Sequence, residues 1–235
     1  MDHYKEIFDK YYSQFDNSEY WIKYKYDHTM RVVEYAKQIA ISLNLSDEDV
    51  ELAKLCGLFH DISRFKQWAE YKTYVDLNSF DHGDMGYEIL KELGIDNEII
   101  LISTKVHNKY EVPEELDDRT KLFCNITRDA DKIDILIDLD NEADDDSVDI
   151  SEEVIESFRN HKMLQNRVAN SQNKTVKMLR CLAFIFNVKY EKTFEIIKEH
   201  NVVNKKCDNI LSKHDDDRIK EIKNILNEFI EERVK

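Results

Sequence analysis

Scarcity of glycine and proline constrains the fold of this chain more than any other feature of its sequence. The 235 residues include 4 glycines and 1 proline, so the tight turns that β-hairpins require are rare. Leucine, lysine and glutamate, which favour helices, are abundant. The sequence therefore predicts an all-α protein, and its length favours one helical domain over residues 1–235.

The charge balance and the apolar segments exclude several classes of protein. Lysine and arginine total 34 against 49 aspartates and glutamates, a formal charge of −15. Such a surface repels a phosphate backbone, so we expect no nucleic-acid partner, although a local positive site for a small nucleotide stays possible. There is no signal sequence and no apolar run long enough for a membrane span, so we expect a cytoplasmic protein with no membrane contact.

The cysteines point to a reduced protein. Cys56, Cys124, Cys181 and Cys207 show no CxxC spacing, and most of them fall on apolar helix faces. We expect free thiols in the core.

Apolar residues recurring every three or four positions predict a succession of helices. We expect them over about 2–15, 27–43 with His28 in the first turn, 46–60, 81–94, 96–107, 119–138, 151–162, 173–187, 189–200 and 215–234. The pattern weakens between 65 and 80, which predicts a loop or a broken helix. Residues of about 138–153 are strongly acidic and lack the glycine of a calcium-binding loop, so they predict a solvated loop before a C-terminal helical extension over 151–235.

The segment Leu58-Phe59-His60-Asp61 places an imidazole and a carboxylate at the end of a buried helix. An ionised carboxylate there is costly unless a positive charge lies beside it. A bound metal ion is the simplest partner.

Further polar residues end or begin other predicted helices, so they can converge on this pair. Imidazole and carboxylate ligands suit zinc, manganese, iron, nickel or cobalt. Any one histidine alone is more often structural than a ligand, and His3, His161, His200 and His214 show no partner pattern. The candidate metal ligands are His28, His60, Asp61, His82, His107 and Asp131.

His28, then His60-Asp61, then Asp131 within Arg128-Asp-Ala-Asp-Lys132, resembles the HD-domain superfamily of metal-dependent phosphohydrolases over about residues 25–140. The resemblance implies an all-α bundle in which these four residues bind a divalent metal. His82 and His107 resemble the extra histidines of dinuclear members, which implies two ions (Mn, Fe, Ni, Co, Zn or Mg) bridged by Asp61. The contexts of His60 and His82 also resemble a group of uncharacterised bacterial HD proteins.

The resemblance implies a hydrolase that cleaves a phosphate ester of a nucleotide or another small phosphorylated metabolite with a metal-activated water. We expect Asp61, Arg64 and Lys132 to act in catalysis. Arg64 falls where cyclic-dinucleotide phosphodiesterases carry a phosphate-contacting lysine, although the Gly-Tyr-Pro signature of those enzymes is absent. Arg31, Arg64, Lys105 and Lys132 are candidates for substrate binding, and a surface charge is an equally good reading of each.

Two other functions stay open at this point. Some dinuclear HD proteins are di-iron oxygenases with the same ligands, and a non-catalytic metal-binding sensor or interaction protein would need no substrate. Motifs of dinucleotide-binding, P-loop, serine-hydrolase and zincin enzymes are absent from the sequence.

Overall fold

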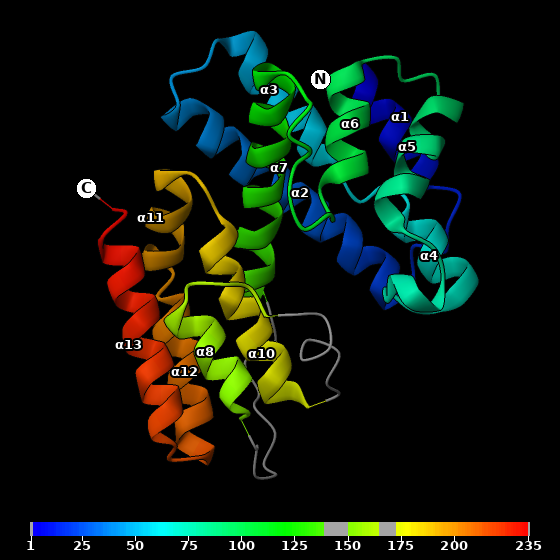
Figure 1. Ribbon diagram of the computed structural model, residues 1–235. Coiled ribbons are helices and arrows are strands. Elements are labelled where there is room, and N and C mark those ends of the chain that lie inside the picture. The colour runs from blue at the N-terminus through cyan, green and yellow to red at the C-terminus, as the bar shows by residue number, and fades with distance from the viewer. Residues whose placement is uncertain (1, 139–149, 165–172, 235) are drawn as a thin grey trace. The chain divides into compact units, whose positions relative to one another are not determined.

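The computed structural model describes residues 2–138, 150–164 and 173–234. These residues are helical with no strand, which confirms the predicted all-α class (Figure 1). The acidic loop expected over 138–153 lies mostly outside the described residues. None of the described helices is both long and apolar enough to cross a membrane. All four cysteines are free thiols, as expected.

The chain divides into two compact units, Met1–Asp131 and Lys132–Lys235, with the boundary inside one helix. Two compact units can belong to one domain or to two, so the single domain expected from the sequence stays a prediction. We call them unit 1 and unit 2.

Unit 1 holds the helices that carry the predicted ligands. They are α1 (Asp2–Tyr12), α2 (Tyr20–Ser42), α3 (Asp47–Phe59), α4 (Arg64–Tyr71), the 3-10 turn η1 (Asp76–Asn78), α5 (His82–Glu92), α6 (Glu98–Val106) and most of α7 (Asp118–Asp138). Helix α2 packs along α3, and α5 packs along α6 (Figure 1). The aromatic core includes Phe8, which contacts Phe59 and Phe65 with ring centroids 6.2 and 5.8 Å apart.

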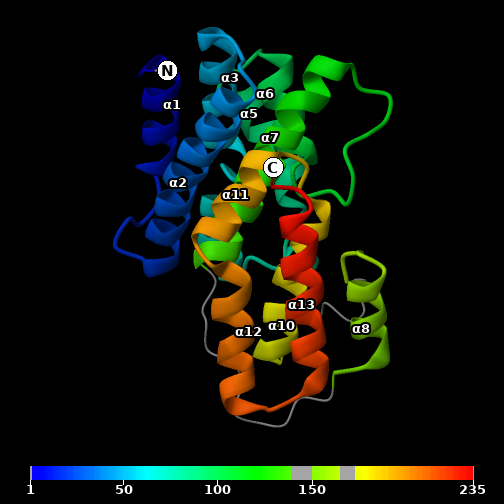
Figure 2. The same ribbon diagram turned by 90° about the vertical axis from the view of Figure 1, so that its left-hand side faces the viewer.

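Unit 2 begins with the last turns of α7. It continues through α8 (Glu152–Arg159), α10 (Lys174–Leu182), the 3-10 turn η2 (Ala183–Asn187), α11 (Glu191–Glu199), α12 (Val202–Lys213) and α13 (Asp217–Glu231). Helices α12 and α13 run side by side (Figure 2). Leu182, Phe194, Ile222 and Leu226 belong to its apolar core.

The largest differences from the expected helices concern α2 and α12. Helix α2 begins at Tyr20, so His28 lies in its third turn and not in the first. The aromatic run after Tyr20 contains no turn residue, and the buried Ile22 gives it an inward face. Helix α12 was not expected, because Lys206 interrupts its apolar stripe; that lysine is 2% exposed.

Candidate metal centre

Six polar side chains of unit 1 converge from five helices. His28 lies within α2, His60 and His107 are the C-cap residues of α3 and α6, His82 opens α5, and Asp61 follows His60. Asp131 comes from α7. The four histidines and Asp61 are buried, and the side chain of Asp131 is 18% exposed. The structure thus brings together all six ligands predicted from the sequence.

Three of these residues form a first group around one oxygen of Asp61. His28 Nε2 lies 3.2 Å from His60 Nε2 and 3.2 Å from Asp131 Oδ1. Asp61 Oδ2 lies 3.5 Å from His28 Nε2 and 3.6 Å from His60 Nε2. The ligand atoms of His28, His60 and Asp131 all lie within 4.8 Å of one another, a spacing that could hold a metal ion.

The other two histidines form a second group around the other oxygen of Asp61. His82 Nε2 and His107 Nε2 are 3.1 Å apart. Asp61 Oδ1 lies 3.7 Å from His82 Nε2 and 3.4 Å from His107 Nε2. Asp61 therefore faces both groups, one with each oxygen.

The protons of three histidines are held on the side away from the cluster. His60 Nδ1 and His107 Nδ1 each lie 2.7 Å from a carbonyl oxygen three residues earlier, that of Gly57 and that of Thr104. A carbonyl can only accept, so each Nδ1 carries the proton and each Nε2 directs a lone pair inward. His82 Nδ1 makes the same kind of contact, 2.6 Å from Asp76 Oδ2.

Inward lone pairs fit a bound cation. Two imidazole lone pairs about 3 Å apart repel each other, whereas two ligands of one metal ion, each about 2.1 Å from it, are separated by roughly 3.0–3.4 Å. The 3.1 Å between His82 and His107 and the 3.2 Å between His28 and His60 agree with that spacing. The donor set is imidazole nitrogen with carboxylate oxygen, which suits a divalent transition metal.

Two basic side chains meet Asp61 on its two sides. Lys25 Nζ donates to Asp61 Oδ2 at 2.7 Å, and Arg64 Nε donates to Asp61 Oδ1 at 3.2 Å. Burial raises the pKa of the Asp61 carboxyl, but these two charges outweigh it and hold the pKa well below its usual range. Asp61 is therefore an ionised carboxylate at neutral pH.

The two histidines of the second group, His82 and His107, are uncharged at neutral pH. Burial, and next the charge of Arg64, lower the pKa of His82 to about 4. Burial also lowers the pKa of His107. Both imidazoles are therefore unprotonated at neutral pH, the form that binds a metal ion.

Arg64 is surrounded by acceptors. Besides Asp61 it donates to Gln67 Oε1 at 2.6 Å, to the carbonyl of Tyr74 at 2.9 Å and to Asp76 Oδ1 at 3.1 Å, and its Nη2 lies 3.1 Å from His82 Nε2. The prediction that placed Arg64 at the site agrees with this position. These contacts fix the guanidinium beside the second group.

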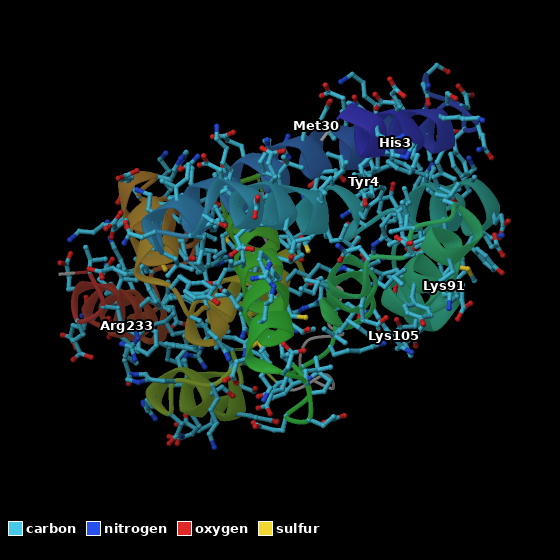
Figure 3. All side chains as sticks on the ribbon, turned by 90° about the horizontal axis from the view of Figure 1, so that it is seen from above. His3, Tyr4, Met30, Lys91, Lys105 and Arg233 are labelled. Atoms are coloured by element: carbon cyan, nitrogen blue, oxygen red, sulfur yellow. The ribbon has the colours of Figure 1, made fainter. Side chains whose placement is uncertain are left out.

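The other three basic residues predicted to bind substrate lie at different places in the structure. Lys132 follows Asp131 on α7 and is buried, and Arg31 is partly exposed three residues after His28. Lys105 lies over the ring of Tyr87, as does Lys91, and both are labelled at the same edge in Figure 3. None of the contacts described for Lys105 involves the six-residue cluster.

Three residues at the site were missed by reasoning from the sequence. Lys25 lies one turn before His28, and its role could have been suspected once α2 was known to begin at Tyr20. Asp76 lies in a segment without a helical period. Arg128 is 5% exposed and donates to the carbonyls of Val106 and His107 at 3.2 and 3.1 Å, and also to those of Lys109 and Tyr110.

Glycines allow α5 to approach α6 closely. A Cβ at Gly83 would lie 2.5 Å from the carbonyl oxygen of Lys105, and one at Gly86 would lie 2.7 Å from Thr104 Cγ2. The side chain of Asp81 caps α5 by accepting from the backbone amides of Gly83 and Asp84 at 3.0 Å. His82 is thereby held against His107.

Residues 26–136 match the family model of the HD domain, and all six cluster residues lie within that segment. The uncharacterized protein MJ0778 of Methanocaldococcus jannaschii is 36% identical over 81 residues, which are 34% of this chain and 42% of that protein. The match thus covers less than half of that relative's length. No solved structure gives a significant match to the chain.

Proposed function

We propose that the protein is a metal-dependent phosphohydrolase, because residues 26–136 match the family model of the HD domain. Its substrate is a phosphate ester of a nucleotide or another small phosphorylated metabolite. His28, His60 and Asp131 would hold one divalent ion and His82 and His107 a second, and Asp61 offers one carboxylate oxygen to each group.

One observation carries this proposal. The two oxygens of Asp61 face two separate pairs of inward-directed imidazoles, with the Nε2 atoms of each pair 3.1–3.2 Å apart. Two such pairs beside one ionised carboxylate fit the donor set of a dinuclear metal site.

When bound, divalent ions lower the pKa of a water molecule and neutralise charge on phosphoryl oxygens. The residues of the chain supply orientation. Lys25 and Arg64 lie at the two oxygens of Asp61, where their positive charges would favour a bound phosphate group. Lys132 and Arg31 are further candidates for this contact.

The proposal is tested with metal-stripped protein reloaded with manganese, cobalt, zinc or iron. Mass spectrometry of metals should give about two ions per chain, consistent with the two groups of ligands. A panel of mononucleotides, cyclic nucleotides and phosphomonoesters should include at least one that is cleaved with release of phosphate or of a phosphomonoester.

Asp61→Asn should lose both metal binding and activity, whereas Asp84→Asn, an exposed carboxylate on α5, should lose neither. Retention of both ions in Asp61→Asn would contradict the shared role of this residue. A di-iron oxygenase would instead be coloured with iron and inactive on every phosphate ester.

A further inference from the structure

Exposed apolar side chains gather at one side of unit 1. Among the described residues, seven large apolar side chains are exposed, and five of them belong to two short segments. These five are Tyr20 and Trp21 at the start of α2, and Tyr71, Val75 and Leu77 at and beyond the end of α4. Figure 1 shows the first turns of α2 beside α4. Clustered exposed apolar side chains are a common feature of interaction and ligand-binding surfaces.

Aromatic rings connect the two segments. The ring of Trp21 lies 5.6 Å from that of Trp68 and 5.5 Å from that of Tyr24, and Trp68 lies 5.3 Å from Tyr74. The Tyr74 hydroxyl donates to the carbonyl of Trp21 at 2.7 Å. We call the set Tyr20, Trp21, Tyr24, Trp68 and Tyr74 the aromatic rim.

The aromatic rim adjoins the metal centre through Tyr74 and Lys25. Lys25 Nζ lies 5.5 Å from the ring centroid of Tyr74 and 2.7 Å from Asp61 Oδ2. The guanidinium of Arg64 lies 5.6 Å from the same ring. Lys25 is also one helical turn after Trp21 on α2, so both project from the same side of that helix.

We propose that the aromatic rim binds a planar aromatic group of the substrate while the phosphate lies at Lys25, Arg64 and the metal centre. This inference rests on the proposed phosphohydrolase function and adds a specificity to it. Trp21 is 41% exposed, so a phosphate ester that carries a flat ring, such as a purine nucleotide, can stack on this aromatic surface. A sugar phosphate or a polyol phosphate lacks that contact.

Binding is measured first, because it does not depend on turnover. The chain has two tryptophans, Trp21 and Trp68, and both belong to the aromatic rim, so tryptophan fluorescence reports on the rim. Titration of the zinc-loaded wild-type protein with AMP should quench this fluorescence to saturation, and ribose 5-phosphate should not. Absence of quenching by AMP, together with equal affinities for the two ligands, would overturn the proposal.

Kinetics then separate the rim from the metal centre. Trp21→Ala should raise KM for an aromatic phosphate ester about tenfold, the effect of one lost stacking contact, and leave KM for glycerol phosphate unchanged. Ile41→Ala, an exposed apolar residue at the other end of α2, should change neither.

The outcomes distinguish this inference from the proposed function. If AMP quenches the tryptophan fluorescence but no phosphate ester is cleaved, the rim binds its ligand and the phosphohydrolase proposal fails. If esters are cleaved and Trp21→Ala changes KM equally for aromatic and aliphatic esters, the rim has no specificity and the inference fails. A Trp21→Ala variant that changes the oligomeric state but not AMP binding would make the rim a contact between copies of the chain, which also overturns it.

Discussion

The carboxylate of Asp76 contacts both His82 and Arg64 at the second group. Its Oδ2 lies 2.6 Å from His82 Nδ1, and its Oδ1 accepts from Arg64 and from Gln67 at 3.1 and 3.0 Å. Burial raises the pKa of Asp76, but the hydrogen bond from His82 and nearby positive charges outweigh it, so Asp76 stays ionised. It therefore fixes both the tautomer of His82 and the direction of Arg64.

Asp76→Ala should weaken metal binding at the second group and spare the first. Loss of a carboxylate behind a ligating histidine commonly costs roughly 10–100-fold in metal affinity. The metal affinity of Asp76→Asn should fall between those of Asp76→Ala and the wild type. The amide oxygen of asparagine still accepts a hydrogen bond but carries no charge. Metal titration followed by calorimetry would resolve the two affinities.

Asp84→Ala is the matched control, since that carboxylate is exposed and contacts Lys109. Equal weakening of both metal affinities in Asp76→Ala would show a general loss of structure and contradict a role confined to His82.

The six candidate ligands could be predicted because each stands beside a strong local pattern. His60 and His107 end apolar helices, and Asp81 gives α5 an N-cap directly before His82. Lys25 and Asp76 could not be predicted in this way. Lys25 precedes the helix predicted over 27–43, so the sequence pattern gave it no helical face to share with His28. Asp76 reaches the site through the 3-10 turn η1, which has no apolar periodicity.

At the scale of helices, the second group depends on how closely α5 approaches α6. Gly83 lies where a Cβ would be 2.5 Å from a backbone carbonyl oxygen and 2.6 Å from Asn108 Oδ1. Backbone cannot yield as a flexible side chain does, so any larger residue must push the two helices apart.

Gly83→Ala should lower the free energy of unfolding by about 1–3 kcal/mol, the usual cost of overpacking, and should weaken the second metal affinity because His82 moves away from His107. Gly57→Ala is a suitable comparison. A Cβ there meets its nearest neighbours at 3.4 Å, and alanine favours a helix interior by about 0.5–1 kcal/mol over glycine. If Gly83→Ala is as stable as the wild type, the helices are not held at this contact.

Arg128 closes the C-terminal end of α6, where His107 is the cap residue. Its guanidinium donates to carbonyls that follow the last helical turn, including that of His107 at 3.1 Å. The end of a helix leaves such carbonyls without partners, and a buried cation satisfies several at once.

Arg128→Met should destabilise the protein by about 3 kcal/mol, because buried carbonyl groups lose a charged donor, and should lower metal content at the second group. Arg119→Met provides the comparison on the same helix, since Arg119 is exposed and pairs with Asp49. Thermal unfolding and metal analysis of the two variants measure the difference. If Arg128→Met is as stable as the wild type and binds metal fully, the hydrogen bonds of Arg128 have no role in placing His107.

Most helices could be predicted from apolar periodicity, and the exceptions have identifiable causes. The start of α2 was placed too late because Asp27 resembles a capping residue, while Glu19, the actual N-cap residue, makes no side-chain capping bond. Helix α12 was missed because Lys206 lies on its buried face. In both cases tertiary burial overrides the local signal.

For the whole molecule, the net charge of −15 and a phosphate substrate are compatible because charge is distributed unevenly. Lys25 and Arg64 lie at Asp61, and two divalent ions would add four positive charges beside the carboxylates of Asp61 and Asp131. The HD resemblance read from the sequence is confirmed over residues 26–136, which leaves the C-terminal unit without an assigned role.

Cooperative unfolding tests whether the two compact units form the single domain that the sequence predicts. Both tryptophans, Trp21 and Trp68, belong to unit 1, so fluorescence reports on that unit while circular dichroism reports on the helices of both. In a single domain the two signals change at the same urea concentration.

Metal at one hundred times its dissociation constant should stabilise the native state by about 2.7 kcal/mol and shift both transitions together. Asp61→Ala should abolish that shift, since it removes the carboxylate common to both metal groups. If metal moves the fluorescence transition and leaves part of the dichroism transition in place, unit 2 unfolds independently, and the chain contains two domains whose boundary falls within α7.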